Sequence, residues 1–262
     1  MTSPPRLRIL CFGDSLTAGY SAWGAVHHPY NEMLETMVSM AYPDLSVVTV
    51  EDGVSGATVE HGFQTRIKAQ FAPPKKKENN KEGDEKPYDW AIILGGTNDI
   101  GMGFPANKIF ESLQEVWKVP LSHGCKVLAL TVPEAGIMTP TVRQRVDAKR
   151  NLLNKLIKSY QHENFYVYDL HAVIPYFSMP ESDRKKYWDD HIHFTPDGYD
   201  MIGNKIGICL VSLLAREKVN SPQRPQKRRR LFKDDDKKFE EEVGDPKSIN
   251  QGYVVVRHAD LD

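Results

Sequence analysis

The sequence predicts an α/β protein built on a mostly parallel sheet that is covered by helices on both faces. Short apolar, β-branched runs alternate along the chain with longer segments of helical periodicity. Three short polar segments that carry reactive side chains each follow the end of a predicted strand. In sheets of this kind the reactive groups gather at the carboxyl ends of the strands, so we expect these segments to meet there.

Five runs of apolar residues predict the strands. The first run, RLRILCF, is apolar enough to be buried, and it ends in the turn residues Gly13, Asp14 and Ser15. The later runs are rich in the β-branched and aromatic residues that strands favour. The predicted strands span residues 6–12, 45–50, 88–94, 125–132 and 165–170.

Segments with helical periodicity separate the strands. The longest of them, residues 143–160, carries an apolar stripe of Leu152, Leu153, Leu156 and Ile157. Such a stripe predicts that the helix packs against the sheet through that side. The predicted helices span residues 29–41, 59–71, 107–122, 143–160 and 199–214.

Two segments lie outside this regular pattern. Residues 73–87, PPKKKENNKEGDEKP, contain almost no apolar side chain and predict a solvated insertion, with a docking loop as the alternative. Residues 219–262 alternate basic and acidic blocks and predict a disordered tail, in which residues 252–258 have the pattern of a strand. We therefore expect one folded domain over residues 1–218.

Composition argues for a small-molecule partner. The formal net charge is -1, so no overall field favours nucleic acid or an anionic membrane. The three cysteines, Cys11, Cys125 and Cys209, are scattered among apolar neighbours, which fits buried free thiols better than disulfides or a zinc site. We expect no metal and no organic cofactor.

The chain is expected to be cytoplasmic. No apolar run is long enough to span a bilayer, and the apolar stretch near the N-terminus is too short for the core of a signal peptide. The basic run Lys227–Arg230 leaves nuclear import as an alternative, although acidic residues follow it closely. The oligomeric state is not predicted.

Ser15 is the candidate nucleophile. It lies in the segment GDSLT, directly after the first predicted strand, where a tight turn would expose its hydroxyl. A serine hydroxyl is a poor nucleophile until a base removes its proton. The structural alternative for this pentapeptide is a serine that caps the start of a helix.

Two further segments carry candidate hydrogen-bond donors. Residues 53–58, GVSGAT, follow the second predicted strand, and their glycines would let the backbone N–H groups approach a substrate. Residues 95–99, GGTND, follow the third strand. The side-chain amide of Asn98 is a good neutral donor toward a developing oxyanion, whereas the alternative for this segment is a helix cap.

The candidate base lies in the segment DDHIH, residues 189–193, before the last predicted helix. Histidine accepts a proton readily near neutral pH. A carboxylate three residues earlier can reach the ring, fix its tautomer and stabilise the imidazolium. Either Asp189 or Asp190 could support a histidine here, and His191 competes with His193.

These four segments resemble the conserved blocks of the SGNH hydrolases, also called the GDSL esterases and lipases, over residues 6–214. The resemblance implies a three-layer, flavodoxin-like α/β/α sandwich with a mainly parallel five-stranded sheet. It implies Ser15 as nucleophile, and the DxxH spacing selects Asp190 with His193. It also implies an oxyanion hole made by the Ser15 and Gly56 backbone N–H groups and the Asn98 amide. Gly53 is the alternative backbone donor, but Gly56 lies at the position that the family uses.

Two other patterns were considered as binding sites. Residues 101–106 resemble a dinucleotide fingerprint, but they do not follow a strand directly and Pro105 interrupts them. His27 and His28 lack a third ligand at a suitable spacing, which favours a solvated turn over a metal site.

The resulting expectation is a serine-dependent carboxylic ester hydrolase that acts on a small-molecule ester. The same residues would serve a thioesterase, a deacetylase or an acyltransferase, and a non-catalytic binding protein is the alternative from another class. Tyr20, Trp23 and Trp188 lie near the reactive segments in sequence. They either line an acyl or alcohol pocket or pack in the core.

Overall fold

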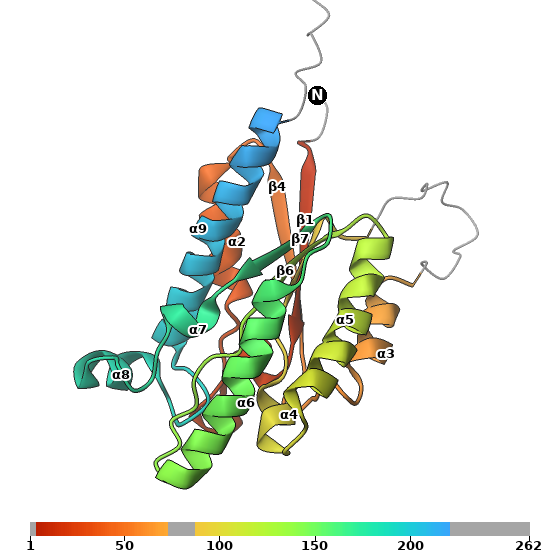
Figure 1. Cartoon of the computed structure of the whole chain (residues 1–262). Helices are drawn as coiled ribbons and strands as arrows, with labels where there is room; N and C mark the ends of the chain where they lie inside the picture. The colour runs from red at the N-terminus through yellow and green to blue at the C-terminus, as the bar shows by residue number, and fades with distance from the viewer. Residues whose placement is uncertain (1–3, 73–86, 221–262) are drawn as a thin grey trace, which may run out of the picture. The chain divides into compact units, whose positions relative to one another are not determined.

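A five-stranded, entirely parallel sheet forms the centre of the fold (Figure 1). The computed structural model describes residues 4–72 and 87–220. The order of the strands is β4-β1-β5-β6-β7, so the chain starts inside the sheet and then extends it in both directions. The strands are β1 (Arg6–Gly13), β4 (Ser46–Gly53), β5 (Trp90–Ile93), β6 (Lys126–Leu130) and β7 (Phe165–Tyr168).

Helices cover both faces of the sheet (Figure 1). On one face pack α2 (Asn31–Ala41) and α9 (Pro196–Asn220). On the other pack α3 (Phe63–Gln70), α5 (Ala106–Ser122) and α6 (Pro140–Ser159). The predicted three-layer α/β/α sandwich is therefore confirmed.

The alternation of side chains along β1 produces the two cores. Ile9 and Cys11 point to the core beneath α2 and α9, while Leu10 and Phe12 point to the core beneath α3, α5 and α6. All four side chains are completely buried, as expected for a central strand of a parallel sheet. Burying a large apolar side chain contributes about 1.5–3 kcal/mol, so these two cores supply the main stabilisation of the fold.

β1 is also the point at which the topology reverses, because it pairs with β4 on one side and β5 on the other. Ligands of open parallel sheets bind outside the carboxyl ends of the strands at such a switch point. The carboxyl ends of β1, β4 and β5 lead directly into the segments of Ser15, Gly56 and Asn98. The topology thus brings three of the four predicted segments to one edge of the sheet.

The structure contains short elements that the sequence pattern did not predict. They are α1 (Ser15–Ala18), β2 (Tyr20–Ser21), η1 (Ala22–Gly24), β3 (Val26–His27), α4 (Thr97–Gly101), α7 (Leu170–Val173) and α8 (Glu181–Tyr187). Elements this short contain too few periods for a hydrophobic pattern to appear.

The predicted helices differ from the structure in their bounds and in one apolar stripe; the last helix, expected over residues 199–214, spans residues 196–220. The helix expected over residues 59–71 begins only at Phe63, because Gly62 directly before it has a φ of +100°, outside the helical region. In α6, Leu152 is 45% exposed and does not belong to the buried stripe, whereas Leu153 and Ile157 are buried.

Several predictions fall outside the described residues. They concern residues 73–86 of the insertion predicted over 73–87, residues 221–262 of the tail predicted over 219–262 with its strand at 252–258, and the basic run 227–230. The domain boundary expected after residue 218 stays a prediction, and α9 continues to Asn220. No helix in the part of the chain that the structure describes has the length and apolarity needed to cross a bilayer.

Candidate active site

Ser15 occupies the first position of the short helix α1, immediately after β1. Asp14 caps this helix by accepting a hydrogen bond from the Leu16 N–H at 3.0 Å. The turn is tight, because a Cβ atom on Gly13 would lie 2.2 Å from Thr17 Oγ1 and 2.5 Å from the Leu94 carbonyl oxygen. Only a glycine therefore fits before Asp14, and the turn fixes the direction of the Ser15 side chain.

A chain of hydrogen bonds joins Ser15, His193 and Asp190. The distance from Ser15 Oγ to His193 Nε2 is 3.0 Å, and that from His193 Nδ1 to Asp190 Oδ2 is 2.9 Å. Ser15 and His193 are 178 positions apart in the sequence, and the fold brings them into contact. These are the distances that a nucleophile, a base and an orienting carboxylate require.

Asp190 is held as an ionised acceptor. Its Oδ1 accepts the backbone N–H groups of Ile192 and His193, each at 2.6 Å. Partial burial by itself would raise the pKa of this carboxyl, but the hydrogen bonds from the His193 ring and from these two N–H groups outweigh it and lower the pKa. An ionised Asp190 can only accept, so in a neutral imidazole the ring proton lies on Nδ1 and Nε2 can accept from the Ser15 hydroxyl.

The loop that carries Asp190 and His193 is closed at its base. Trp188 and Phe194 form an isolated antiparallel bridge, and their rings pack with centroids 4.4 Å apart. Inside this loop the Asp189 N–H donates to the His193 carbonyl at 3.0 Å. Because Trp188 and Phe194 are both buried, the core anchors the loop and limits the freedom of the imidazole.

The segments of Gly56 and Asn98 are tied together. The side-chain amide of Asn98 donates to the Ala57 carbonyl at 2.9 Å, which places it beside Gly56 and leaves one further N–H on the same nitrogen. Gly56 has a φ of +76°, a conformation that favours glycine. Val54 donates to the Gly13 carbonyl at 3.2 Å and so connects this loop to the Ser15 turn.

Gly53, the rival of Gly56, uses its N–H elsewhere. That N–H donates to Glu51 Oε1 at 2.5 Å. A Cβ on Gly53 would lie 2.2 Å from the Ala18 backbone nitrogen, so this glycine is required for the close packing of β4 against α1. The geometry therefore favours Gly56 over Gly53 as a donor.

Two buried carboxyls flank the site. Asp14 is fully buried, and this burial raises its pKa to about 7. Asp99 is also buried, and burial raises its pKa, opposed by the hydrogen bonds from Val59 and Glu60. Asp14 Oδ2 has no hydrogen-bond partner among the described residues, which adds to the preference for the protonated form.

Arg66 is a structural residue of the site that the sequence did not reveal. Its Nη1 donates to the Gly13 carbonyl at 3.0 Å, and its Nη2 donates to the Asp52 carbonyl at 2.6 Å and to Asp52 Oδ1 at 2.5 Å. The guanidinium also lies 4.6 Å from the centroid of the Phe12 ring. Arg66 thus fastens the ends of β1 and β4 to each other. A lone arginine on a helix gives no signal of such a role.

The remaining candidates occupy distinct places. Tyr20 lies against His193, with ring centroids 4.6 Å apart, whereas Trp188 belongs to the core and Trp23 is 92% exposed. His191 is exposed, and its Nδ1 is 3.1 Å from the Tyr176 hydroxyl. The Asp189 carboxylate accepts from the Ala22 N–H at 2.7 Å.

In the segment of His27 and His28, one histidine is paired with a carboxylate. The Nε2 atom of His28 is 2.7 Å from Asp200 Oδ1. Over residues 4–72 and 87–220, no group of three or more His, Cys, Asp or Glu side chains is arranged to hold a metal ion. Cys11, Cys125 and Cys209 are free thiols.

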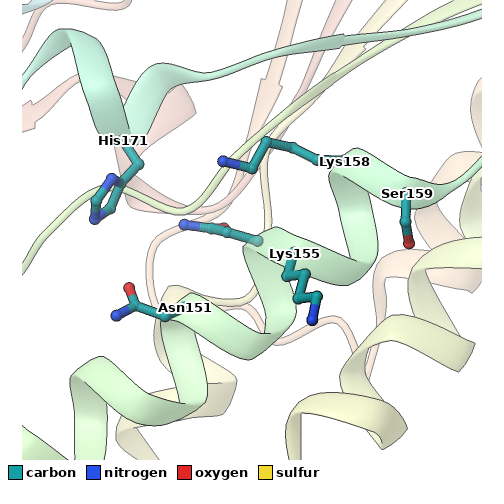
Figure 2. A pocket seen from close by; sticks show the side chains of 6 residues that line it. Asn151, Lys155, Lys158, Ser159 and His171 are labelled. Atoms are coloured by element: carbon teal, nitrogen blue, oxygen red, sulfur yellow. The ribbon is translucent and has the colours of Figure 1, made fainter.

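A cavity of about 420 Å³ lies elsewhere, between α6 and the start of α7 (Figure 2). Ser15, Asp190 and His193 do not line it. The Lys158 ammonium on its wall is paired with Asp169 at 2.8 Å. The lining consists of polar side chains, namely Asn151, Asn154, Lys155, Lys158, Ser159 and His171.

Solved structures with this fold include several esterases. A lipase/acylhydrolase from Enterococcus faecalis has 23% identity and a TM-score of 0.56, with 79% of this chain and 96% of that chain covered. A member of the lipolytic protein G-D-S-L family from Veillonella parvula has 20% identity and a TM-score of 0.56, with coverage of 79% and 98%. Acetylxylan esterase Axe2 from Geobacillus stearothermophilus has 16% identity and a TM-score of 0.54, with coverage of 80% and 96%. No curated protein sequence matches the chain.

The fold is a three-layer α/β/α sandwich whose polar segments lie at the carboxyl edge of a parallel sheet, as in these solved structures. The sequence model of the GDSL-like lipase/acylhydrolase family matches residues 11–201, most of the chain. The chain therefore belongs to the GDSL-like lipase/acylhydrolase family and is a hydrolase of ester bonds. The four short segments therefore predicted the family correctly.

Proposed function

We propose that the chain is a carboxylic ester hydrolase that acts through an acyl-enzyme on Ser15. The observation that carries this proposal is the continuous hydrogen-bond chain from Ser15 Oγ through the His193 ring to Asp190. This arrangement supports the roles of nucleophile, base and orienting carboxylate for the three residues. The lone pair of Nε2 faces the hydroxyl, and the carboxylate holds the proton of Nδ1.

In the first step Ser15 Oγ attacks the ester carbonyl carbon while its proton passes to His193 Nε2. The carbonyl π electrons move to the oxygen, which becomes the oxyanion of a tetrahedral intermediate. Asp190 stabilises the imidazolium that forms at the same time. When the intermediate collapses, the bond to the alcohol oxygen breaks and His193 returns its proton to that oxygen.

The oxyanion is held by three donors, namely the Ser15 N–H, the Gly56 N–H and the side-chain amide of Asn98. Support for this assignment comes from the hydrogen bond between the Asn98 amide and the Ala57 carbonyl, which keeps the amide next to Gly56. Donors fixed by the fold do not reorganise when charge develops, which is why such sites stabilise the transition state strongly.

In the second step water replaces the alcohol. His193 accepts a proton from the water as its oxygen attacks the acyl carbon of the Ser15 ester, and the same three donors hold the second oxyanion. Collapse of this intermediate breaks the bond to Ser15 Oγ, which takes the proton back from His193. The free acid leaves, and the enzyme is restored.

The test compares Ser15→Ala with Ser55→Ala, which changes an exposed serine of the neighbouring loop. Ser15→Ala should lower kcat on 4-nitrophenyl acetate by at least ~10³-fold and abolish covalent labelling by a fluorophosphonate. Ser55→Ala should still be labelled. Circular dichroism should show the same fold for both variants. Hydrolysis or labelling that persists in Ser15→Ala would overturn the assignment.

A further inference from the structure

The short hairpin after α1 packs on His193 through Tyr20 and exposes a tryptophan in its turn. Its strands β2 and β3 pair Tyr20 with His27 and Ser21 with Val26, and the residues between them form the turn η1. Trp23 in this turn is 92% exposed, more than any other large apolar side chain of the described residues. A single exposed apolar side chain is common, but an indole exposed to this extent offers a large rigid face against which a ligand can pack.

The turn holds Trp23 in an unfavourable backbone conformation. Ala22 and Trp23 have φ values of 49° and 57°, and both are in the left-handed region that residues with a Cβ seldom adopt. Within residues 4–72 and 87–220, only one other non-glycine residue has a positive φ. Such conformations persist where surrounding contacts impose them, and they are concentrated at functional sites.

The contacts that impose this conformation come from the loop of the proposed base. The Ala22 N–H donates to Asp189 Oδ2 at 2.7 Å, and Asp189 directly precedes Asp190. The turn also closes on itself through the hydrogen bond from the Ala25 N–H to the Ala22 carbonyl at 3.0 Å. The position of Trp23 is therefore tied to the same loop that carries His193.

The other side of the hairpin lies against the imidazole. The Tyr20 ring packs on the His193 ring, with centroids 4.6 Å apart and planes inclined by 47°. A Cβ atom on Gly24 would lie 3.0 Å from Tyr20 Cε2, so the backbone beside Trp23 also rests against this ring. Tyr199 donates to the Tyr20 carbonyl at 2.8 Å and fixes the base of the hairpin.

The reaction places the alcohol part of an ester on this side. His193 must protonate the leaving oxygen, so that oxygen has to come within hydrogen-bond reach of Nε2. The oxyanion donors of Gly56 and Asn98 belong to different loops, after β4 and β5. The alcohol group thus leaves past His193 and the hairpin packed on it.

We propose that Trp23 determines specificity for the alcohol part of the ester, binding alcohols with an apolar or aromatic face against its indole. This inference rests on the proposed function, because it uses the direction in which the alcohol leaves. It commits to the alcohol rather than the acyl group. The contact would cover the exposed indole surface and add binding for benzyl or cyclohexyl esters but not for methyl esters.

The experiment measures kcat/KM for two ester series with wild type, Trp23→Ala and Trp23→Phe. The alcohol series is methyl, butyl, cyclohexyl and benzyl acetate, and the acyl series is methyl acetate, butyrate and hexanoate. Met40→Ala, which removes a 74% exposed side chain from α2, is the matched control. Trp23→Ala should lower kcat/KM for benzyl and cyclohexyl acetate ~3- to 10-fold relative to methyl acetate, the range expected for loss of one aromatic contact.

The other readouts separate binding from structure. Preferences within the acyl series should stay as in wild type, Trp23→Phe should restore much of the benzyl preference, and the Tm should be unchanged because the side chain is exposed. A uniform loss over both series, a loss confined to the acyl series, or no loss at all would overturn the proposal. If Ser15→Ala abolishes activity while Trp23→Ala has no selective effect, only this proposal fails and the proposed function stands.

Discussion

Asp190 and His193 are joined twice, once by the ring Nδ1 to Oδ2 at 2.9 Å and once by the backbone N–H to Oδ1 at 2.6 Å. The spacing of three residues makes this double contact possible, because the chain turns back over the carboxylate that supports it. A single carboxylate thus fixes both the orientation of the imidazole and the shape of the loop that presents it.

Asp190→Asn tests this relationship. An amide can donate its own N–H to Nδ1 and favour the wrong ring tautomer, so kcat should fall ~10³- to 10⁴-fold while the loop keeps its shape. Asp189→Asn is the matched comparison, because Asp189 is adjacent but bonds to Ala22 instead of to the imidazole. It should reduce kcat on methyl acetate far less. Equal losses in the two variants would contradict the assignment of Asp190.

Asn98→Ala tests the neutral donor of the proposed oxyanion hole. Loss of one such donor should reduce kcat by about 10²- to 10³-fold with a much smaller change in KM, because the oxyanion forms only in the transition state. Steady-state kinetics on 4-nitrophenyl acetate measure both constants. Asn107→Ala, at an exposed position of α5, is the control and should behave as wild type. An increase in KM without a fall in kcat would assign Asn98 to ground-state binding instead.

Gly56→Ala is compared with Gly62→Ala. Both glycines have a positive φ, at +76° and +100°, and in both cases an added Cβ would meet no atom within 4 Å. Each substitution should therefore lower the free energy of unfolding through backbone strain alone, by ~1–2 kcal/mol for Gly56→Ala and by at least as much for Gly62→Ala, whose ψ of −33° lies outside the left-handed helical region. Denaturant unfolding measures this loss.

Only Gly56→Ala should also impair catalysis, since a small displacement of the N–H group that faces the oxyanion is enough to reduce kcat by ten- to about a hundred-fold. Gly62 lies at the start of α3 and presents no proposed donor. If the two variants lose activity in proportion to their lost stability, Gly56 has no special place in the oxyanion hole.

The sequence was informative where a pattern repeats or where residue types combine. The five strands were predicted because each is an apolar run. Residues 9–12 of β1 pair with a strand on each side, and their side chains alternate between the two cores. Ser15 and Asn98 were singled out because their side-chain chemistry and their place after strands agreed, and His193 because of its carboxylate three residues earlier and the family's DxxH spacing. The contact over 178 positions between Ser15 and His193 could not be measured from sequence.

The sequence was uninformative where a single contact, one backbone angle or a very short element determines the local structure. The start of α3 depends on Gly62, whose φ of +100° is outside the helical region and is not predicted by helix propensity. Arg66 resembles any solvated arginine until its carbonyl partners are known. The hairpin of Tyr20 has two-residue strands, and these are too short to show alternation.

Asp14→Asn tests the buried carboxyl next to the nucleophile. Burial raises the pKa of Asp14 from its ordinary 3.8 to about 7 in the folded protein. Its favourable contribution to stability is therefore fully present below the unfolded pKa and is lost as the pH rises through about 7. Asparagine does not ionise and also caps helices well, so it mimics the protonated acid at every pH.

The free energy of unfolding of Asp14→Asn should consequently rise relative to wild type between about pH 4 and pH 8, by up to ~4 kcal/mol. Urea unfolding at intervals across this range measures the difference. Asp197→Asn, which changes an exposed carboxylate in the first turn of α9, is the control, and its difference from wild type should not grow with pH. A difference between Asp14→Asn and wild type that stays constant over the range would show that Asp14 is ionised in the folded protein. A nearby cation such as Arg66 would then offset the rise in pKa that burial causes.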